Sequence, residues 1–278
     1  MKLGLALAGG GTRGAAHIGA IKAFEESGIK FDFLGGTSAG GLVVVLYSMG
    51  FTSDEMLNIL KTFGKEMLGV TPKSIILNMR EKRGFHLRGF TTGQNIEHIF
   101  NEMAKAKNIV NIKDIKMPLA VTAVDIITGE KRVFTNSRID REYYIKNIEI
   151  GKVVRASSSV PGVYSPLEFE NYQFVDGGLL DNVPVTEVKR LGADRVVSIS
   201  FDIDRSQRAK NFVEILTKSL DVMSAKIVED EIYISDCAIK VNAEKLGMFD
   251  VDSIDEAYRR GYAAAKEKIE EIKKMMEQ

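Results

Sequence analysis

Short apolar runs alternate with longer amphipathic segments along most of this chain. The apolar runs occupy residues 3–8, 31–35, 119–124 and 195–200. The clearest helical patterns occupy residues 42–49, 185–191 and 251–271. Apolar runs of this length indicate strands that are buried on both faces, as in parallel sheets. The pattern therefore predicts an α/β fold with three layers, helix–sheet–helix, around a mostly parallel central sheet.

Two of the predicted strands lead directly into glycine-rich turns. The first strand runs into Gly9-Gly10-Gly11-Thr12-Arg13-Gly14, and the second runs into Gly36-Thr37-Ser38-Ala39-Gly40. Because consecutive parallel strands end at the same edge of a sheet, we expect the two turns to lie side by side.

Ser38 stands at the centre of a Gly-x-Ser-x-Gly pattern, between Gly36 and Gly40. A serine nucleophile on a tight strand-to-helix turn needs small flanking residues, and the chain here has the order strand, turn, helix. The N-terminus of the following helix favours negative charge beside the serine. The alternative interpretation is that Ser38 only caps this helix.

A histidine partner for Ser38 is missing from the expected place. In α/β-hydrolases an acid and then a histidine follow the serine. The histidines here are His17, His86 and His98, and none follows a plausible acid. If Ser38 is a nucleophile, a carboxylate is therefore expected to activate it directly. His17 lies on the predicted helix after the glycine loop and is expected to be packed or hydrogen-bonded there.

The glycine loop has two interpretations. Gly9-x-Gly11-x-x-Gly14 matches the dinucleotide-binding fingerprint, which would make the protein an NAD-dependent oxidoreductase. That fingerprint needs an acid at the end of the second strand, whereas Asp32 precedes the apolar run. Alternatively, the N–H groups of Gly9, Gly10 and Gly11 stabilise an oxyanion during acyl transfer. Arg13 then adds positive charge or holds the loop in place.

A candidate carboxylate is Asp176, which follows a short strand-like run and precedes Gly177 and Gly178. Taken alone, Asp-Gly-Gly is most simply an ordinary turn. Asp125 is a second carboxylate at the end of a predicted strand, before a predicted hairpin turn at Gly129. It is expected to be a turn residue.

Four separated blocks of the chain together resemble the bacterial patatin-like phospholipases. They are residues 9–14, 36–40, 155–162 and 176–178, and they occur in the family's order across most of the chain. The resemblance implies a patatin-like fold and a serine–aspartate dyad, with Ser38 as nucleophile and Asp176 as its base. It also implies an oxyanion hole in the glycine loop, assisted by Arg13. The implied activity is hydrolysis of carboxylic esters in phospholipids or related acyl esters, without a metal or another cofactor.

The composition is that of an ordinary globular protein. The chain has 278 residues, of which 45% are hydrophobic and 27% charged, and 38 basic residues balance 38 acidic ones. This length fits one domain over residues 1–278, and the neutral total disfavours nucleic acid as a partner. Cys237 is the single cysteine. Because no disulfide can form within the chain and the apolar start is too short for a signal peptide, a cytoplasmic location is expected.

Residues 67–90 combine apolar side chains with a basic cluster. Ile75 and Ile76 precede Arg80, Lys82 and Arg83. One interpretation is a lid or interfacial insertion that contacts acyl chains and anionic head groups, with peripheral contact at the inner face of the membrane. The other is an ordinary helix face with a solvated loop. A lipid-binding protein without catalysis remains the functional alternative to a lipid acyl hydrolase.

Overall fold

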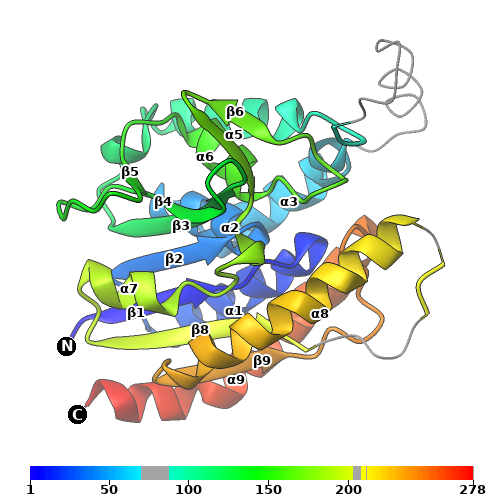
Figure 1. The fold of residues 1–278 in the computed structure, drawn as a ribbon. Coiled ribbons are helices and arrows are strands. Elements are labelled where there is room, and N and C mark those ends of the chain that lie inside the picture. Colours follow the sequence, from blue (N-terminus) through cyan, green and yellow to red (C-terminus); the bar gives the residue numbers. More distant parts are fainter. Residues whose placement is uncertain (70–87, 203–207, 211, 278) are drawn as a thin grey trace, which may run out of the picture.

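The computed structural model describes residues 1–69, 88–202, 208–210 and 212–277 (Figure 1). Its strands are β1 (Leu3–Leu7), β2 (Phe33–Thr37), β3 (Leu119–Asp125), β4 (Glu130–Thr135), β5 (Tyr144–Ile145), β6 (Leu167–Phe169), β7 (Tyr172–Asp176), β8 (Arg195–Phe201) and β9 (Cys237–Val241). Within these residues they form one sheet in the order β5-β4-β3-β2-β1-β8-β9, and β7 pairs with both β3 and β6. The five neighbouring strands β3, β2, β1, β8 and β9 run parallel to one another, so the sheet is mostly parallel as predicted.

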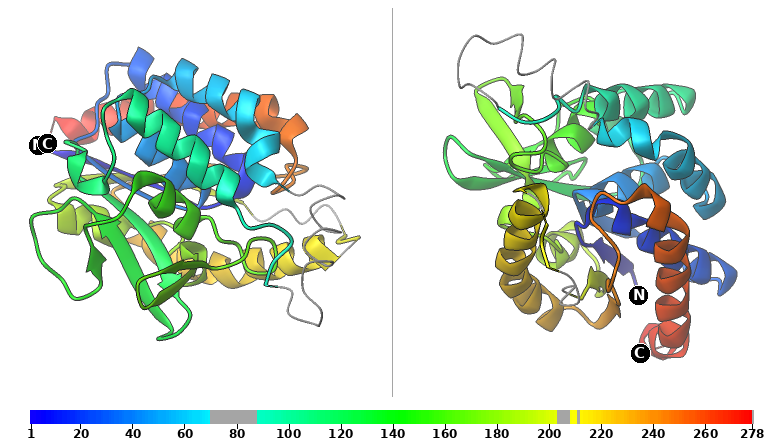
Figure 2. Two further views of the ribbon diagram at one scale, coloured as in Figure 1. Left: turned by 90° about the horizontal axis from the view of Figure 1, so that it is seen from above. Right: turned by 90° about the vertical axis from the view of Figure 1, so that its right-hand side faces the viewer.

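Helices cover both faces of this sheet. They are α1 (Ala15–Glu26), α2 (Ala39–Ser48), α3 (Ser53–Leu68), α5 (Gln94–Ala106), α6 (Ile150–Ser157), α7 (Val185–Leu191), α8 (Phe212–Tyr233) and α9 (Ile254–Met276). Figure 2 shows α8 on one side of the sheet and α1, α3 and α9 on the other. Two separate apolar clusters fill the two interfaces, one with α7 and α8 and one with the remaining helices. The prediction of three layers is confirmed.

The first strand shows why this sheet is apolar throughout. All five residues of β1 are buried, because β1 lies between β2 and β8 and is covered on both faces. Leu5 and Leu7 belong to the cluster under α1 and α9, whereas Ala6 belongs to the cluster under α7 and α8. The small residues on the second face let α7 approach closely. A Cβ on Gly4 would come within 2.3 Å of Val188.

The structure shifts two predicted boundaries at the second glycine turn. The strand predicted at residues 31–35 is β2, which begins at Phe33 and continues to Thr37. Gly35 and Gly36 are therefore strand residues, paired with Ala6 and Leu7 of β1. Glycine is a poor strand former by itself, so the pairing to β1 and β3 overrides local preference. The helix predicted from residue 42 is α2, which starts directly after Ser38.

The other predicted elements are located close to their expected positions. The hairpin after Gly129 joins β3 and β4, and the predicted helix at residues 185–191 is α7. Of the predicted lid at residues 67–90, only residues 67–69 and 88–90 belong to the described part of the chain. Ile75, Ile76 and the basic cluster lie outside it, so the lid stays a prediction. In the described residues, no helix is both long and apolar enough to cross a bilayer.

Candidate active site

Strand β3 brings Ser38 and Asp176 together. Its residue Thr122 pairs with Thr37, the last residue of β2, and its next residue, Ala123, pairs with Asp176. Strand β2 runs parallel to β3 and β7 runs antiparallel to it, so the ends of β2 and β7 meet beside the same two residues. Ser38 follows directly after Thr37. The sheet register thus places the two side chains at one point.

The backbone at Ser38 adopts a conformation that most residues avoid, with φ 52° and ψ −120°. Such strain is maintained only where the surroundings hold it, and it is common at functional sites. Here the N–H of Ser38 donates to Oγ of Ser157 at 2.8 Å. The side chain of Ser38 makes no capping hydrogen bond to α2, so the interpretation as a simple helix cap is wrong.

Gly36 and Gly40 allow the chain to fold this tightly. A Cβ on Gly36 would lie 2.4 Å from the carbonyl oxygen of Gly40, and a Cβ on Gly40 would lie 2.2 Å from that of Leu7. Both distances are far inside van der Waals contact with rigid backbone. Each glycine of the pattern is therefore required by close backbone packing around the turn.

Asp176 has a buried carboxylate that accepts a hydrogen bond from the hydroxyl of Ser38. Its Oδ1 also accepts the N–H of Gly178 at 2.9 Å, so the residue forms the expected Asp-Gly turn as well. Burial raises the pKa of Asp176 to about 6, although the hydrogen bonds from Ser38 and Gly178 lower it. No ion pair to this carboxylate occurs within the described residues. A carboxylate of this pKa is ionised at neutral pH and is a stronger base than an exposed aspartate.

The glycine loop lies beside Ser38 with two N–H groups available. Gly10, Gly11 and Ser38 line the same cavity as Asp176. The N–H of Gly9 is already used, since it donates to the backbone oxygen and to Oδ1 of Asn182 at 3.2 and 3.0 Å. Among the described residues, the N–H groups of Gly10 and Gly11 have no acceptor. The adjacent turns predicted from the strand order are therefore found, with donors beside the candidate nucleophile.

Arg13 holds this loop rather than reaching Ser38. Its buried Nε donates to the carbonyl oxygen of Gly10 at 3.0 Å, and its Nη2 binds Asp221 of α8 at 3.1 Å. The carbonyl of Gly10 and the N–H of Gly11 belong to one peptide unit and point in opposite directions. By holding the carbonyl on its own side, Arg13 orients the N–H of Gly11 away from itself.

Three supporting residues were not found by sequence reasoning. Ser157 accepts the N–H of Ser38, the carbonyl of Ser159 accepts the N–H of Asp176 at 3.0 Å, and Asn182 holds Gly9. Ser157 and Ser159 belong to the block at residues 155–162, so the family resemblance pointed to the segment but not to these contacts. Nothing in the local sequence indicates that Asn182 binds the glycine loop.

The remaining candidates have structural roles. His17 is fully buried, its Nε2 lies 2.8 Å from the carbonyl oxygen of Ala8, and burial lowers its pKa to about 4. The carboxylate of Asp125 accepts the N–H groups of Ile127, Thr128 and Gln173, as a turn residue does. Both predictions are confirmed.

Asp32, the acid that the dinucleotide interpretation would need, does not lie beside the glycine loop. The carboxylate of Asp32 accepts the N–H of Leu3 at 2.9 Å, at the end of the sheet where β1 begins. The glycine loop lies at the opposite end, where β1 stops. Asp32 therefore cannot hold a ribose beside that loop.

Comparison with known proteins gives a consistent family. The family model of the patatin-like phospholipases matches residues 5–189, which contain the glycine loop, Ser38 and Asp176. The lysophospholipase NTE1 of Mycosarcoma maydis is 28% identical over 299 residues, covering 97% of this chain and 15% of the relative. That of Pyricularia oryzae is 32% identical over 198 residues, covering 71% of this chain and 12% of the relative. The chain thus spans less than a fifth of the length of either relative.

Solved structures share the fold. VipD from Legionella pneumophila aligns with a TM-score of 0.56 at 15% identity, over 97% of this chain and 67% of VipD. The human GIVD cytosolic phospholipase A2, in complex with methyl gamma-linolenyl fluorophosphonate, aligns with a TM-score of 0.51 at 10% identity. That alignment covers 98% of this chain and 57% of the phospholipase. At these identities the likeness concerns the fold alone.

Proposed function

The chain belongs to the patatin-like phospholipase family, and on this premise we propose that it hydrolyses lipid carboxylic esters through Ser38 and Asp176. One observation carries the proposal. A buried carboxylate with a raised pKa accepts the hydroxyl of a serine held on a strained turn. This pair can generate a nucleophile without a histidine.

In the first half of the reaction, Ser38 Oγ attacks the ester carbonyl while its proton passes to Asp176. The N–H groups of Gly10 and Gly11 hold the oxyanion that forms, in a hole oriented by Arg13. The tetrahedral intermediate collapses as Asp176 returns the proton to the leaving alcohol. An acyl-enzyme remains on Ser38.

In the second half, Asp176 takes a proton from water, which attacks the acyl carbonyl. The same two N–H groups hold the second oxyanion. Asp176 then protonates Ser38 Oγ as the fatty acid leaves. Each proton that Asp176 accepts is returned within the same half, so the cycle balances and the dyad is regenerated.

An apolar cavity on one side of Ser38 fits the acyl chain. Besides Ser38 it is lined by Ala39, Leu42, Leu60 and Phe249. A second apolar cavity shares Ala39, Leu42 and Leu60 with it and extends beneath α3 toward Phe100. A hydrocarbon chain bonded to a carbonyl at Ser38 would transfer from water into these surroundings with favourable free energy. This supports a lipid substrate over a small polar ester.

The test is hydrolysis of nitrophenyl butyrate and a lysophospholipid by wild type and by Ser38→Ala. We expect the variant to lose about 10³-fold or more in kcat on both substrates, because the nucleophile is gone. A fluorophosphonate should label wild type and not the variant. Wild-type protein that binds lipid but hydrolyses neither ester would instead support the alternative, lipid binding without catalysis.

We also propose that α8 contacts a lipid surface. Four large apolar side chains on this helix are between 56% and 65% exposed: Phe212, Ile215, Val222 and Met223. Asp221 and Ser224 of the same helix line the cavity that contains Ser38, so contact through α8 would bring the site to the lipid. Lys210 and Arg208 precede the helix and suit an anionic surface. The cytoplasmic location expected from the sequence stays a prediction.

The contact is tested by cosedimentation with vesicles containing anionic phospholipid. Replacing Val222 and Met223 by serine should weaken binding about tenfold, since two exposed apolar side chains no longer enter the lipid. The matched control replaces Val110 and Ile127, which are 64% and 65% exposed elsewhere on the protein. Equal loss in both double variants would contradict the proposal.

A further inference from the structure

The glycine loop is anchored at both ends by distant segments of the chain. Its first glycine is held by Asn182, as described above. At the other end, Thr12 donates its N–H to the carbonyl oxygen of Met248 at 2.8 Å, and its hydroxyl to the carbonyl oxygen of the preceding residue at 2.9 Å. This partner segment lies between β9 and α9. Between the two anchors lie Gly10 and Gly11, whose N–H groups are the candidate oxyanion donors.

The peptide unit between Gly10 and Gly11 can rotate more freely than the rest of the loop. Neither residue has a Cβ, so the peptide plane can turn at little steric cost while the anchored ends stay in place. Such a turn would bring the carbonyl of Gly10 to where the N–H of Gly11 now points. An oxyanion would then meet an acceptor instead of a donor. The orientation of this one peptide therefore decides whether the hole has two donors or one.

Two contacts hold the carbonyl of Gly10 in its present direction. Gly10 is the N-terminal cap of the 3-10 helix at Gly11–Gly14, so its carbonyl begins a helix whose hydrogen bonds have poor geometry. Nε of Arg13 donates to the same oxygen at 3.0 Å, and as a charged donor it makes the stronger bond. The direction of the Gly11 N–H thus depends on where the side chain of Arg13 is held.

Asp221 of α8 holds the side chain of Arg13. That side chain is 4% exposed, and its Cζ lies 5.7 Å from the centroid of the Phe201 ring. A buried cation is costly unless a carboxylate pairs with it. Nη2 of Arg13 lies 3.1 Å from each carboxylate oxygen of Asp221, and no other carboxylate among the described residues is ion-paired with Arg13. Asp221 therefore compensates the buried charge and sets the direction of the guanidinium.

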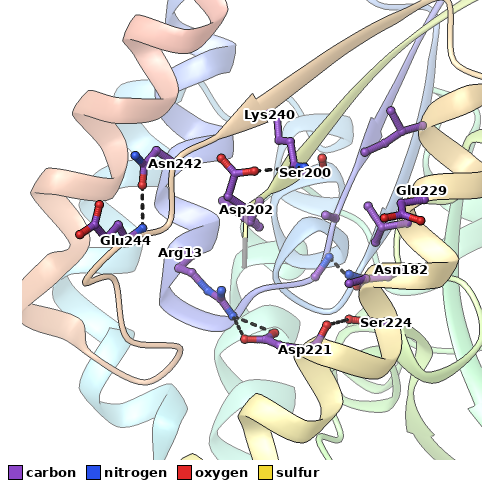
Figure 3. A pocket seen from close by; sticks show the side chains of 16 residues that line it. Arg13, Asn182, Ser200, Asp202, Asp221, Ser224, Glu229, Lys240, Asn242 and Glu244 are labelled. Atoms are coloured by element: carbon purple, nitrogen blue, oxygen red, sulfur yellow. Dashed lines mark hydrogen bonds and ion pairs between the residues drawn. The ribbon is translucent and has the colours of Figure 1, made fainter. Parts of the chain in front are cut away.

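A cavity beside this ion pair gives Arg13 another place to go. Arg13 and Asp221 both line a cavity of about 690 Å³ between α8 and the ends of β1, β8 and β9. Figure 3 shows the two side chains pointing toward one another across it, one from the glycine loop and one from α8. A polar cavity of this size admits water. Without Asp221, the guanidinium would move into the cavity to be solvated, and the carbonyl of Gly10 would lose its charged donor.

We propose that Asp221 is a positioning residue of the oxyanion hole, which acts through Arg13 to keep the N–H of Gly11 available as a donor. The proposal rests on the ester hydrolysis proposed above. In this role Asp221 does not touch the ester. It lies beyond residue 189, where the match to the family model ends, so α8 completes a site whose dyad lies within that match.

The experiment measures kcat and KM for nitrophenyl butyrate, a soluble ester whose hydrolysis needs no lipid surface. Asp221→Ala should lower kcat about 10²-fold, the usual effect of losing one oxyanion donor. KM should stay within about threefold of wild type, because the donor acts on the oxyanion and not on the ground-state carbonyl. Asp221→Asn keeps an acceptor for Arg13 without the charge and should lose about tenfold in kcat. An unchanged kcat in Asp221→Ala, or a loss that appears in KM instead, overturns the proposal.

A double-mutant cycle tests whether Asp221 acts through Arg13. Arg13→Met combined with Asp221→Ala should be no slower than Arg13→Met alone, because the second change removes a contact that is already lost. Losses in the two single variants that multiply in the combined variant would mean that Asp221 acts independently of Arg13, which overturns the proposal. If circular dichroism shows that Asp221→Ala is unfolded, Asp221→Asn takes its place in the cycle.

The matched control is Glu231→Ala. Glu231 is a half-buried acid of the same helix, and it accepts the N–H and the hydroxyl of Thr186 at 3.0 and 3.1 Å. It anchors α8 at a point about 15 Å along the helix from Asp221. This variant should keep kcat within about threefold of wild type. An equal loss in Glu231→Ala and Asp221→Ala would mean that both acids only hold α8 in place, and the proposal would be wrong.

The outcomes separate the two proposals. Active wild type together with an Asp221→Ala variant of unchanged kcat overturns the positioning role alone. Hydrolysis that persists in Ser38→Ala overturns the proposed function. Labelling of Ser38 by a fluorophosphonate provides a measurement without turnover. Its rate constant should also fall in Asp221→Ala, because the phosphoryl oxygen occupies the same hole, and an unchanged rate constant would count against the positioning role.

Discussion

Asp176 and Asp181 stand five residues apart on either side of one short turn, and they look alike by most measures. They are 7% and 2% exposed. Burial raises the pKa of each to about 6. A search for perturbed carboxylates would return both, so the pKa alone does not identify the base.

The difference lies in their partners. Asp176 accepts a serine hydroxyl and one N–H, and it lines the cavity with Ser38. Asp181 binds Lys131 at 2.8 Å, and Lys131 also binds the buried Glu187 at 2.8 Å. The backbone oxygen of Asp181 accepts the hydroxyls of Thr37 and Thr122. Asp181 is thus part of an ion-pair cluster that ties β4 to the segment before α7.

This comparison teaches what makes a buried carboxylate available as a base. A cation beside a carboxylate stabilises its charge and lowers its tendency to accept a proton. Asp176 has no such cation among the described residues and faces a hydroxyl that can donate its proton. In the same part of the chain, the side chain of Asp181 binds the Lys131 ammonium and accepts no hydroxyl.

The largest expected effect comes from Asp176→Asn. Asparagine keeps the acceptor for Gly178 but cannot take the proton of Ser38. We expect kcat for nitrophenyl butyrate to fall about 10³-fold, with the fold intact by circular dichroism. Activity within tenfold of wild type would contradict the assignment of Asp176 as the base.

The pH dependence of kcat/KM gives the next effect. Asp176 must be ionised to accept a proton, and its pKa is about 6. Activity should therefore be constant above pH 7 and fall about tenfold per unit as the pH drops below 6. A rate profile measured with nitrophenyl butyrate tests this, and a plateau that extends to pH 4.5 would speak against it.

Asp181→Asn is the matched control for both experiments and has the smallest effect. The variant should retain activity within about threefold and keep the same pH profile. It should instead lower the free energy of unfolding by about 1–3 kcal/mol, because Lys131 loses one of its two buried partners. Denaturant unfolding measures this change. A large loss of activity without a loss of stability would mean that the two aspartates share the chemistry.

The serine turn was predictable because its requirements are local. Gly36 and Gly40 are needed for backbone approaches within a few residues of Ser38 or to the neighbouring strand β1. The apolar runs predicted β1, β3 and β8 because a strand covered on both faces has no polar positions to alternate with. The predicted boundaries of β2 were wrong because Gly35 and Gly36 become strand residues only when β1 pairs with them.

The sequence by itself determined the family, the layered α/β fold and the candidate nucleophile, since each depends on short-range pattern and spacing. Only the tertiary structure decided how Asp176 reaches Ser38, through the register of β3, and why Asp181 does not. It also decided that Asn182 accepts the N–H of Gly9, so that within the described residues the donors beside Ser38 are Gly10 and Gly11. These features depend on burial and on contacts between distant segments, and free energies of that kind are set by what surrounds a group once the chain has folded.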